Sequence, residues 1–246
     1  MEQSAEDANC NAADFEKQQN VIVLSKENSK ARKYLELPLP CNLISYGNNI
    51  VASVQEECRD IVSDYMNKYS VEHCFETPHL HVLDDALKNL NIRSCFMAEY
   101  FLPDLNYLQE RSCNYSIQLL HQEDFADLYI DTWSNALCEK RKELDVLGVG
   151  AFDAGRMVGF AACSADCESM WQIGVDVLPE YRRQNIASAL TSRLALEILY
   201  AGKIPFYCAA WSNVKSVRNA VKSGFRVAWV ELTAKKNEFV DKMNQK

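Results

Sequence analysis

The sequence lacks any apolar run long enough to cross a lipid bilayer. Its first twenty residues also lack the basic start and apolar core of a secretory signal. The ten cysteines include no CxxC pair and no framework of short spacings. We therefore expect a protein that does not insert into membranes, lies in the cytoplasm and keeps its cysteines as reduced thiols.

A basic surface that could hold a nucleic acid is missing as well. The chain has 26 Lys and Arg against 34 Asp and Glu, a formal net charge of −8, and no basic stripe interleaved with aromatic residues. An acidic surface repels a phosphate backbone, so no nucleic-acid partner is expected. His79 and His81 lie near His73 and Cys74, but metal ligands need more matched partners than this, and no metal site is predicted.

What the sequence does contain is the composition of an ordinary globular protein, with 48% hydrophobic and 24% charged residues. At 246 residues it is long enough for one or two domains.

The most informative segment runs from Trp171 to Ala187. Apolar residues alternate from Trp171 to Val177, which predicts a half-buried strand. Pro179 ends that strand, and a polar, cationic turn then leads into an amphipathic helix over 186–200. A helix start that follows a cationic turn can hold phosphate, because its free N–H groups and positive dipole end face the turn.

This turn, Arg182-Arg183-Gln184-Asn185-Ile186-Ala187, resembles the acetyl-CoA pyrophosphate loop of the GNAT superfamily of N-acyltransferases, Q/R-x-x-G-x-G/A. The first and last positions fit, whereas Asn185 stands where the family has its central glycine. Asn is the non-glycine residue that best tolerates a left-handed conformation, so we expect the shape of the loop to survive.

The following residues strengthen the resemblance. Gly202 ends the predicted helix, a strand is expected over 205–211, a second helix runs to Ser223, and a last strand covers 225–232. This order is that of the C-terminal half of the GNAT fold, and the wording around Asn213 and Gly224-Phe225 is also similar to that family. A strand over 115–120, a helix over 123–139 and a hairpin turning at 153–155 supply the first half.

Charge favours the same region. Between Arg182 and Arg226 there are eight basic residues and a single acid, Glu197, although residues 1–112 carry 18 acidic and 10 basic side chains. A local cationic patch suits a ligand with several phosphates.

The resemblance implies a set of residues around acetyl-CoA, the expected co-substrate. The backbone N–H of Val175 would polarise the thioester carbonyl, and Val177 would contact the pantetheine arm. The remaining candidates belong to the phosphate loop or to the segment after the next strand: Arg182, Arg183, Gln184, Asn185, Ile186, Ala187, Ser188, Asn213, Ser216 and Asn219.

The general base and acid are harder to assign. Where relatives carry a glutamate early on the fourth strand this chain has Trp171, and where others carry a tyrosine before the Gly-Phe pair it has Ala220. Glu168 as base and Tyr207 as acid are the substitutes within reach. A water-relayed base, or an amine that arrives neutral, would need neither.

The predicted fold class is α/β (α+β), a GNAT-like mixed sheet flanked by helices. We expect a flexible leader (1–19), an N-terminal α/β domain (20–112), a GNAT domain (113–233) and a polar tail (234–246). In the N-terminal half, strands are expected over 21–24 and 43–51, the latter interrupted at 46–49. A helix over 54–69, a strand over 73–76, a helix over 82–90 and a strand over 94–101 then repeat the order helix–strand–helix–strand of 186–232. That half is either a degenerate GNAT-like repeat without a phosphate loop or an unrelated α/β cap.

Two functions follow from these patterns. The first is an N-acetyltransferase that moves an acetyl group from acetyl-CoA to an amine, on a small molecule or a peptide, by direct attack in a ternary complex. The second is a catalytically inactive acyl-CoA-binding or interaction module, which the residues Asn185, Trp171 and Ala220 favour. A transferase of longer acyl groups would keep the same site, and an exposed edge strand would allow a homodimer.

Overall fold

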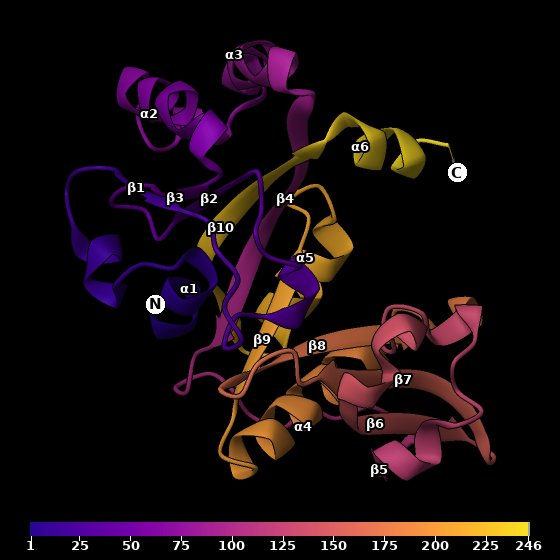
Figure 1. Cartoon of the computed structure of the whole chain (residues 1–246). Coiled ribbons are helices and arrows are strands. Elements are labelled where there is room, and N and C mark those ends of the chain that lie inside the picture. Colours follow the sequence, from indigo (N-terminus) through magenta and orange to yellow (C-terminus); the bar gives the residue numbers. More distant parts are fainter. Residues whose placement is uncertain (246) are drawn as a thin grey trace. The chain divides into compact units, whose positions relative to one another are not determined.

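The structure is a computed structural model that describes residues 1–245, and it divides into two compact units (Figure 1). Unit 1 comprises Met1–Glu99 and Ala228–Lys246, and unit 2 comprises Tyr100–Val227. Lys246, the end of the expected tail, lies outside the described residues. The expected domain limits at 112/113 and 233 stay predictions.

Unit 1 is built on a mixed sheet. Its strands lie in the order β1 (Val21–Leu24), β3 (Val51–Val54), β2 (Cys41–Ser45), β10 (Phe225–Lys236) and β4 (Ile92–Pro103), of which β4 and β10 also supply residues to unit 2. β1 is parallel to β3, whereas β2 is antiparallel to both β3 and β10. The interruption expected at 46–49 is confirmed, because the stretch over 43–51 belongs to two strands joined by the turn at Gly47.

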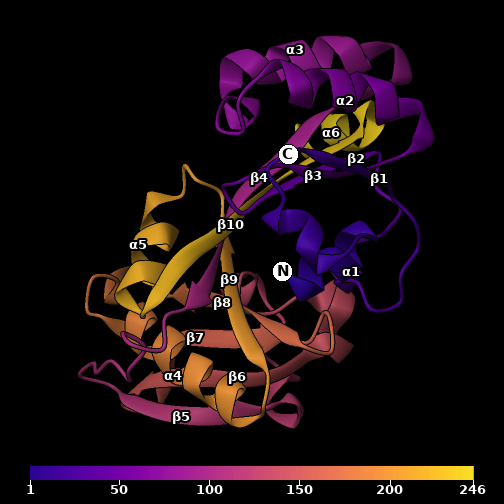
Figure 2. The same ribbon diagram turned by 90° about the vertical axis from the view of Figure 1, so that its left-hand side faces the viewer.

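Helices cover both faces of this sheet. Helices α2 (Arg59–Lys68) and α3 (Thr77–Leu87) lie over one face and α1 (Glu2–Ala8) lies toward the other (Figures 1 and 2). The cross-strand neighbours Leu43, Ala52 and Leu232 are buried on the α2–α3 side with residues of both helices. The alternation of apolar side chains along the strands thus forms the core of unit 1.

The two ends of the chain contribute to unit 1. The segment expected to be a flexible leader contains α1 and a 3₁₀ turn (Ala12–Glu16), and Ala8 and Phe15 are fully buried. The expected polar tail continues β10 to Lys236 and then forms α6 (Asn237–Met243).

Two expectations for the N-terminal half are wrong in detail. The helix expected from Val54 begins at Arg59, after β3 and a 3₁₀ turn, and the second helix begins at Thr77. The strand expected over 73–76 is a 3₁₀ turn, because the N–H groups of Phe75 and Glu76 bond carbonyls three residues back, both at 3.1 Å. The hypothesis of an internal repeat therefore loses one of its elements and stays a prediction.

Unit 2 contains the predicted GNAT-like order of elements. Its strands follow β4 in the order β9 (Ile204–Ala209), β8 (Met170–Val177), β7 (Arg156–Ser164), β6 (Asp145–Asp153) and β5 (Ser116–His121). All neighbours from β8 to β5 are antiparallel, whereas β8 and β9 run parallel. The predicted hairpin turn is confirmed, with positive φ at Ala154 and Gly155. The mixed α+β fold expected from the sequence is therefore confirmed.

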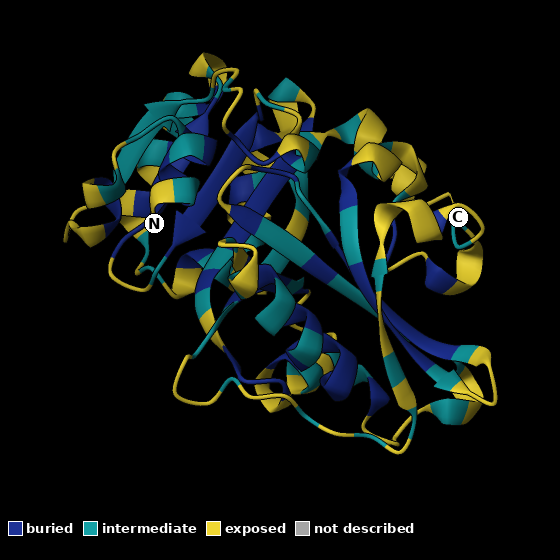
Figure 3. Cartoon of the chain, turned by 90° about the horizontal axis from the view of Figure 1, so that it is seen from below, coloured by how far each residue is buried: buried dark blue, intermediate teal, exposed yellow. Residues whose placement is uncertain are grey.

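Helix α4 (Ile186–Tyr200) packs on one face of this sheet, against β6, β7 and β8, and α5 (Val214–Lys222) contacts α4 and β9. In Figure 3 the strands carry most of the buried residues, whereas exposed residues gather in loops and on outer helix surfaces. Leu190, Leu194 and Ile198 of α4 are fully buried. The predicted apolar stripe therefore forms the core of unit 2.

The helix expected over 123–139 is wrong. The segment forms three 3₁₀ turns, η6 (Gln122–Phe125), η7 (Asp131–Trp133) and η8 (Glu139–Leu144), joined by irregular chain. Carboxylates take the N–H groups that a continuous helix would need. Asp176 accepts from the Ala136 N–H and Asp145 accepts from the Cys138 N–H, both at 3.0 Å.

Candidate functional site

Strand β8 diverges from β9 after a short stretch of pairing. Six consecutive residues of β8, Gln172 to Val177, pair with β7, whereas its pairing with β9 covers only Met170 to Gln172, opposite Ile204 to Phe206. Beyond Gln172 the edge of β8 that faces β9 is therefore not closed by that strand.

Two hydrogen bonds establish which backbone groups lie on this open edge. The Leu178 N–H donates to Val158 of β7 at 3.0 Å, and the Ser169 carbonyl accepts from the Ile204 N–H at 2.9 Å. Because successive strand residues point their N–H groups to opposite sides, Val175 and Val177 direct theirs away from β7. Val175 and Val177 are the two residues of this strand that the family resemblance implied as contacts of acetyl-CoA.

The predicted phosphate loop lies directly after β8. A 3₁₀ turn (Pro179–Tyr181) leads into the exposed residues Arg182 to Asn185, and α4 begins at Ile186. Arg183 and Asn185 both have φ of 65°. The left-handed conformation that glycine would provide is thus present with asparagine in its place.

The N–H groups at the start of α4 remain directed at the loop. The bond from the Ala189 N–H to the Asn185 carbonyl, at 3.0 Å, closes the first helical turn, which leaves the N–H groups before it without intrahelical partners. Ile186 packs into the core, Ala187 is half-buried, and the Ser188 hydroxyl donates to the Asn185 carbonyl at 3.0 Å. This is the arrangement that binds phosphate at a helix start.

Neighbouring side chains hold the loop in shape. The Arg182 Nε donates to the Val177 carbonyl at 3.1 Å. The Tyr115 hydroxyl donates to Gln184 Oε1, and the Lys222 ammonium donates to Asn185 Oδ1. Tyr115 and Lys222 were not predicted as site residues, and only the position of Lys222 in the basic region gave any signal in the sequence.

The polar candidates after β9 have partners within unit 2. Asn213 caps α5 by accepting from the Ser216 N–H at 3.2 Å, and the Ser216 hydroxyl lies 2.7 Å from that of Tyr207. Asn219 donates to Thr191 Oγ1 at 3.0 Å. These contacts fix α5 beside β9 and α4.

The two candidate catalytic side chains lie in different parts of unit 2. Glu168 is exposed in the connection before β8, and the five strand steps from Met170 to Val175 alone extend about 17 Å. Tyr207 is buried among core residues under α5, and this burial raises the pKa of its hydroxyl. The length of β8 thus separates Glu168 from the Val175 N–H.

Sequence reasoning missed Gly174 and Asp176, which hold the loop at Asn135 and Ala136 over β8. A Cβ on Gly174 would lie 1.9 Å from the Asn135 carbonyl oxygen, so only glycine fits beneath this loop. Two residues further, Asp176 accepts from the Asn135 N–H, the Asn135 Nδ2 and the Ala136 N–H at 2.9, 2.6 and 3.0 Å. A glycine in mid-strand was the available signal.

Comparison with known proteins identifies the family. A model of the family described as GNAT acetyltransferase matches residues 48–229, which is most of the chain. The chain belongs to the GNAT acetyltransferase family. The family resemblance expected from the phosphate loop is thus confirmed, and the family's chemistry is acyl transfer.

Solved structures of similar proteins are distant. A putative GNAT acetyltransferase from Novosphingobium aromaticivorans is 17% identical, with a TM-score of 0.46 over 58% of this chain and 66% of its own. A GCN5-related N-acetyltransferase-like protein from Streptococcus suis is 20% identical, with a TM-score of 0.47 over 65% and 68%. The chain thus spans about two thirds of the length of these relatives.

A putative acetyltransferase from Salmonella typhimurium, solved with its cofactor acetyl-CoA, is 17% identical, with a TM-score of 0.38 over 50% of this chain and 94% of its own. No curated protein matches the chain.

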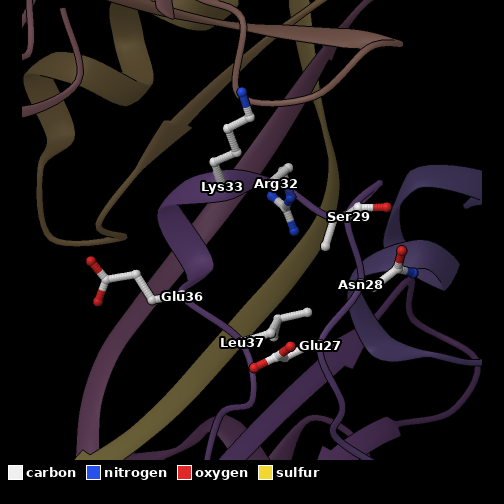
Figure 4. Close-up of a pocket in the computed structure, with 8 residues that line it drawn as sticks. Glu27, Asn28, Ser29, Arg32, Lys33, Glu36 and Leu37 are labelled. Carbon is white, nitrogen blue, oxygen red and sulfur yellow. The ribbon is translucent and has the colours of Figure 1, made fainter.

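Other kinds of site were sought over the same residues. Within residues 1–245, no three His, Cys, Asp or Glu side chains gather as a metal site would require. Across this range no helix combines the length and apolarity that a bilayer-crossing segment needs. Unit 1 has an open pocket of about 460 Å³, lined by residues of the 27–37 segment, and none of the predicted site residues lines it (Figure 4).

Proposed function

We propose that this protein transfers an acetyl group from acetyl-CoA to an amine acceptor, a small molecule or a peptide. The observation that carries the proposal is the open edge of β8 beside the left-handed loop at the start of α4. One feature offers backbone donors to a thioester, and the other offers them to a diphosphate. Family membership supports the same reaction class.

In this reaction the amine nitrogen attacks the thioester carbon, and negative charge develops on the carbonyl oxygen. The Val175 N–H donates to that oxygen, and Val177 lines the pantetheine arm further along the same edge. The carbon–sulfur bond then breaks, and the leaving thiolate takes up a proton. Asn185 and the N–H groups from Arg183 to Ser188 hold the diphosphate, with Arg182 at the entry to the loop.

The proton of the attacking amine has two routes. Glu168, the candidate base, lies in the connection before β8, away from the Val175 N–H. The amine therefore arrives neutral or loses its proton through water. By either route, the rate of acetyl transfer is raised by placing the amine against the thioester carbon and by polarising its carbonyl.

Thermal unfolding with and without acetyl-CoA tests the proposal. A ligand at a hundred times its dissociation constant stabilises a protein by about 2.7 kcal/mol, and a chain of this size then gains about 5–11 °C in midpoint. Asn185→Asp keeps the side-chain size but adds a negative charge in the loop, so we expect it to abolish the shift. Asn48→Asp, the same change at an exposed turn of unit 1, is the matched control and should keep the shift.

A second function, binding without turnover, is favoured by Trp171 and Ala220, which stand where relatives carry a base and an acid. The release of free CoA from acetyl-CoA, in the presence of a panel of primary amines, separates the two functions. A thermal shift without CoA release at any amine would establish the binding module. The absence of any shift with millimolar acetyl-CoA would contradict both.

A further inference from the structure

Helix α5 presents three cations on one side. Lys215, Arg218 and Lys222 follow one another at spacings of three and four residues, which places them on one side of the helix, and all three are exposed. The helix contains no acidic residue. Its opposite side carries the fully buried Ala220 and also Ser216, whose hydroxyl lies 2.7 Å from that of Tyr207, so the basic stripe faces solvent.

One end of this stripe lies at the phosphate loop. The Lys222 ammonium donates to Asn185 Oδ1, the side-chain oxygen of the residue that replaces the motif glycine. A glycine could not make this contact because it has no side chain. Asn185 therefore both keeps the left-handed turn and holds a lysine beside the first N–H groups of α4.

Neighbouring acids do not neutralise the stripe. From Arg182 to Arg226 the single acid is Glu197, and Arg193 bonds it at 2.7 Å. Among residues 1–245, Lys215, Arg218 and Lys222 form no ion pair. Like charges gathered without counter-charges create a positive potential beside the loop.

Acetyl-CoA has three phosphate groups, whereas the loop offers N–H donors to the two of the diphosphate. Its diphosphate is matched by the N–H groups of the loop, but a third, dianionic phosphate sits on the 3′ position of the ribose. We propose that Lys222 and Arg218 bind this 3′-phosphate, so that the site discriminates CoA thioesters from those that lack it. This inference rests on the proposed binding of acetyl-CoA.

The test compares the dissociation constants of acetyl-CoA and of acetyl-dephospho-CoA, which lacks the 3′-phosphate alone, by isothermal titration calorimetry. Wild type should bind acetyl-CoA about tenfold or more tightly than the dephospho compound, because hydrogen bonds between charged groups are lost with the phosphate. Lys222→Ala with Arg218→Ala should bring the two constants together by weakening acetyl-CoA alone. Lys88→Ala, an exposed lysine of unit 1, is the control for loss of charge and should leave the ratio unchanged.

Three results would overturn the inference. The first is a wild-type ratio near one. The second is an unchanged ratio in the double variant. The third is an equal weakening of both ligands, which would mean that the two cations act on the loop or its diphosphate. If wild type binds neither compound, the proposed function itself fails, and the two failures are thereby distinguished.

Discussion

At the residue scale, Asp145 is the acid whose protonation responds to pH near neutrality. It is buried at the start of β6, accepts from the Cys138 N–H and the Tyr129 hydroxyl, and lies near Arg141 and Asp166. Burial raises the pKa of its carboxyl to about 6, against the lowering effect of its hydrogen bonds and of Arg141. Desolvation of the charged form therefore outweighs the favourable contacts.

This pKa has a consequence for stability. A carboxyl whose pKa is higher in the folded than in the unfolded state binds protons more readily when folded, so its contribution is present at low pH and is lost as pH rises through about 6. We expect Asp145→Asn, which does not titrate, to lose less stability than wild type between pH 5 and pH 7. Urea unfolding at both pH values measures this, and a constant difference between the two proteins would contradict it.

At the residue scale the loop also shows how far a motif can depart from its pattern. Asn185 replaces a glycine but keeps φ of 65°, as its tolerance of the left-handed region predicts. The contact with Lys222 could not be predicted in the same way, because it joins residues 37 positions apart through side chains alone. A local conformational preference is contained in the sequence of the loop, whereas a partner on another helix is not.

At the element scale, the loop over β8 depends on one carboxylate. Asp176 takes three hydrogen bonds from Asn135 and Ala136, and hydrogen bonds to charged groups are among the stronger ones in proteins. We expect Asp176→Ala to cost about 2 kcal/mol and to speed hydrogen exchange at the amides of Asn135 and Ala136. Hydrogen exchange followed by NMR resolves these amides.

Asp131→Ala serves as the control for this change, because Asp131 is an exposed acid of the same segment. Unchanged exchange at Asn135 and Ala136 in the Asp176 variant would show that the loop is held by packing and not by the carboxylate.

Unit 2 shows where the prediction of helices and strands from sequence succeeds and where it fails. Helix α4 and the β6–β7 hairpin match the expected limits closely, because apolar periodicity and turn residues are local signals. The helix expected over 123–139 does not form, since distant carboxylates such as Asp176 and Asp145 capture its N–H groups. The open edge of β8 was expected from the family resemblance, and no pattern within β8 itself predicts it.

At the scale of the whole molecule, the first residues of the chain are tied to its last strand within unit 1. Arg32 is buried between Asp7 of α1, at 2.6 Å, and Glu231 of β10, at 2.5 Å. Removing one partner of a buried ion pair leaves a charge without compensation. The expectation of a loose leader missed this link because the three residues are far apart in sequence.

We expect Asp7→Ala to destabilise unit 1 by about 3–5 kcal/mol, the usual cost of breaking a buried ion pair. Its neighbour Glu6 makes an exposed ion pair with Lys30 at 3.8 Å, so Glu6→Ala should cost about 1 kcal/mol or less. Chemical denaturation of both variants measures the difference. If Asp7→Ala lowered the free energy of unfolding by no more than about 1 kcal/mol, as expected for Glu6→Ala, the buried ion pair would contribute little to the stability of unit 1.

The division of unit 1 into two pieces of sequence also sets an order of events during translation. Residues 100–227 emerge from the ribosome as one uninterrupted stretch, and domains tend to fold as units while they are synthesised. Unit 1 folds later, because β2 pairs with β10 and Arg32 pairs with Glu231, both of which are synthesised after most of unit 2. The first hundred residues therefore remain incomplete, with an open edge on β2, until β10 has left the ribosome.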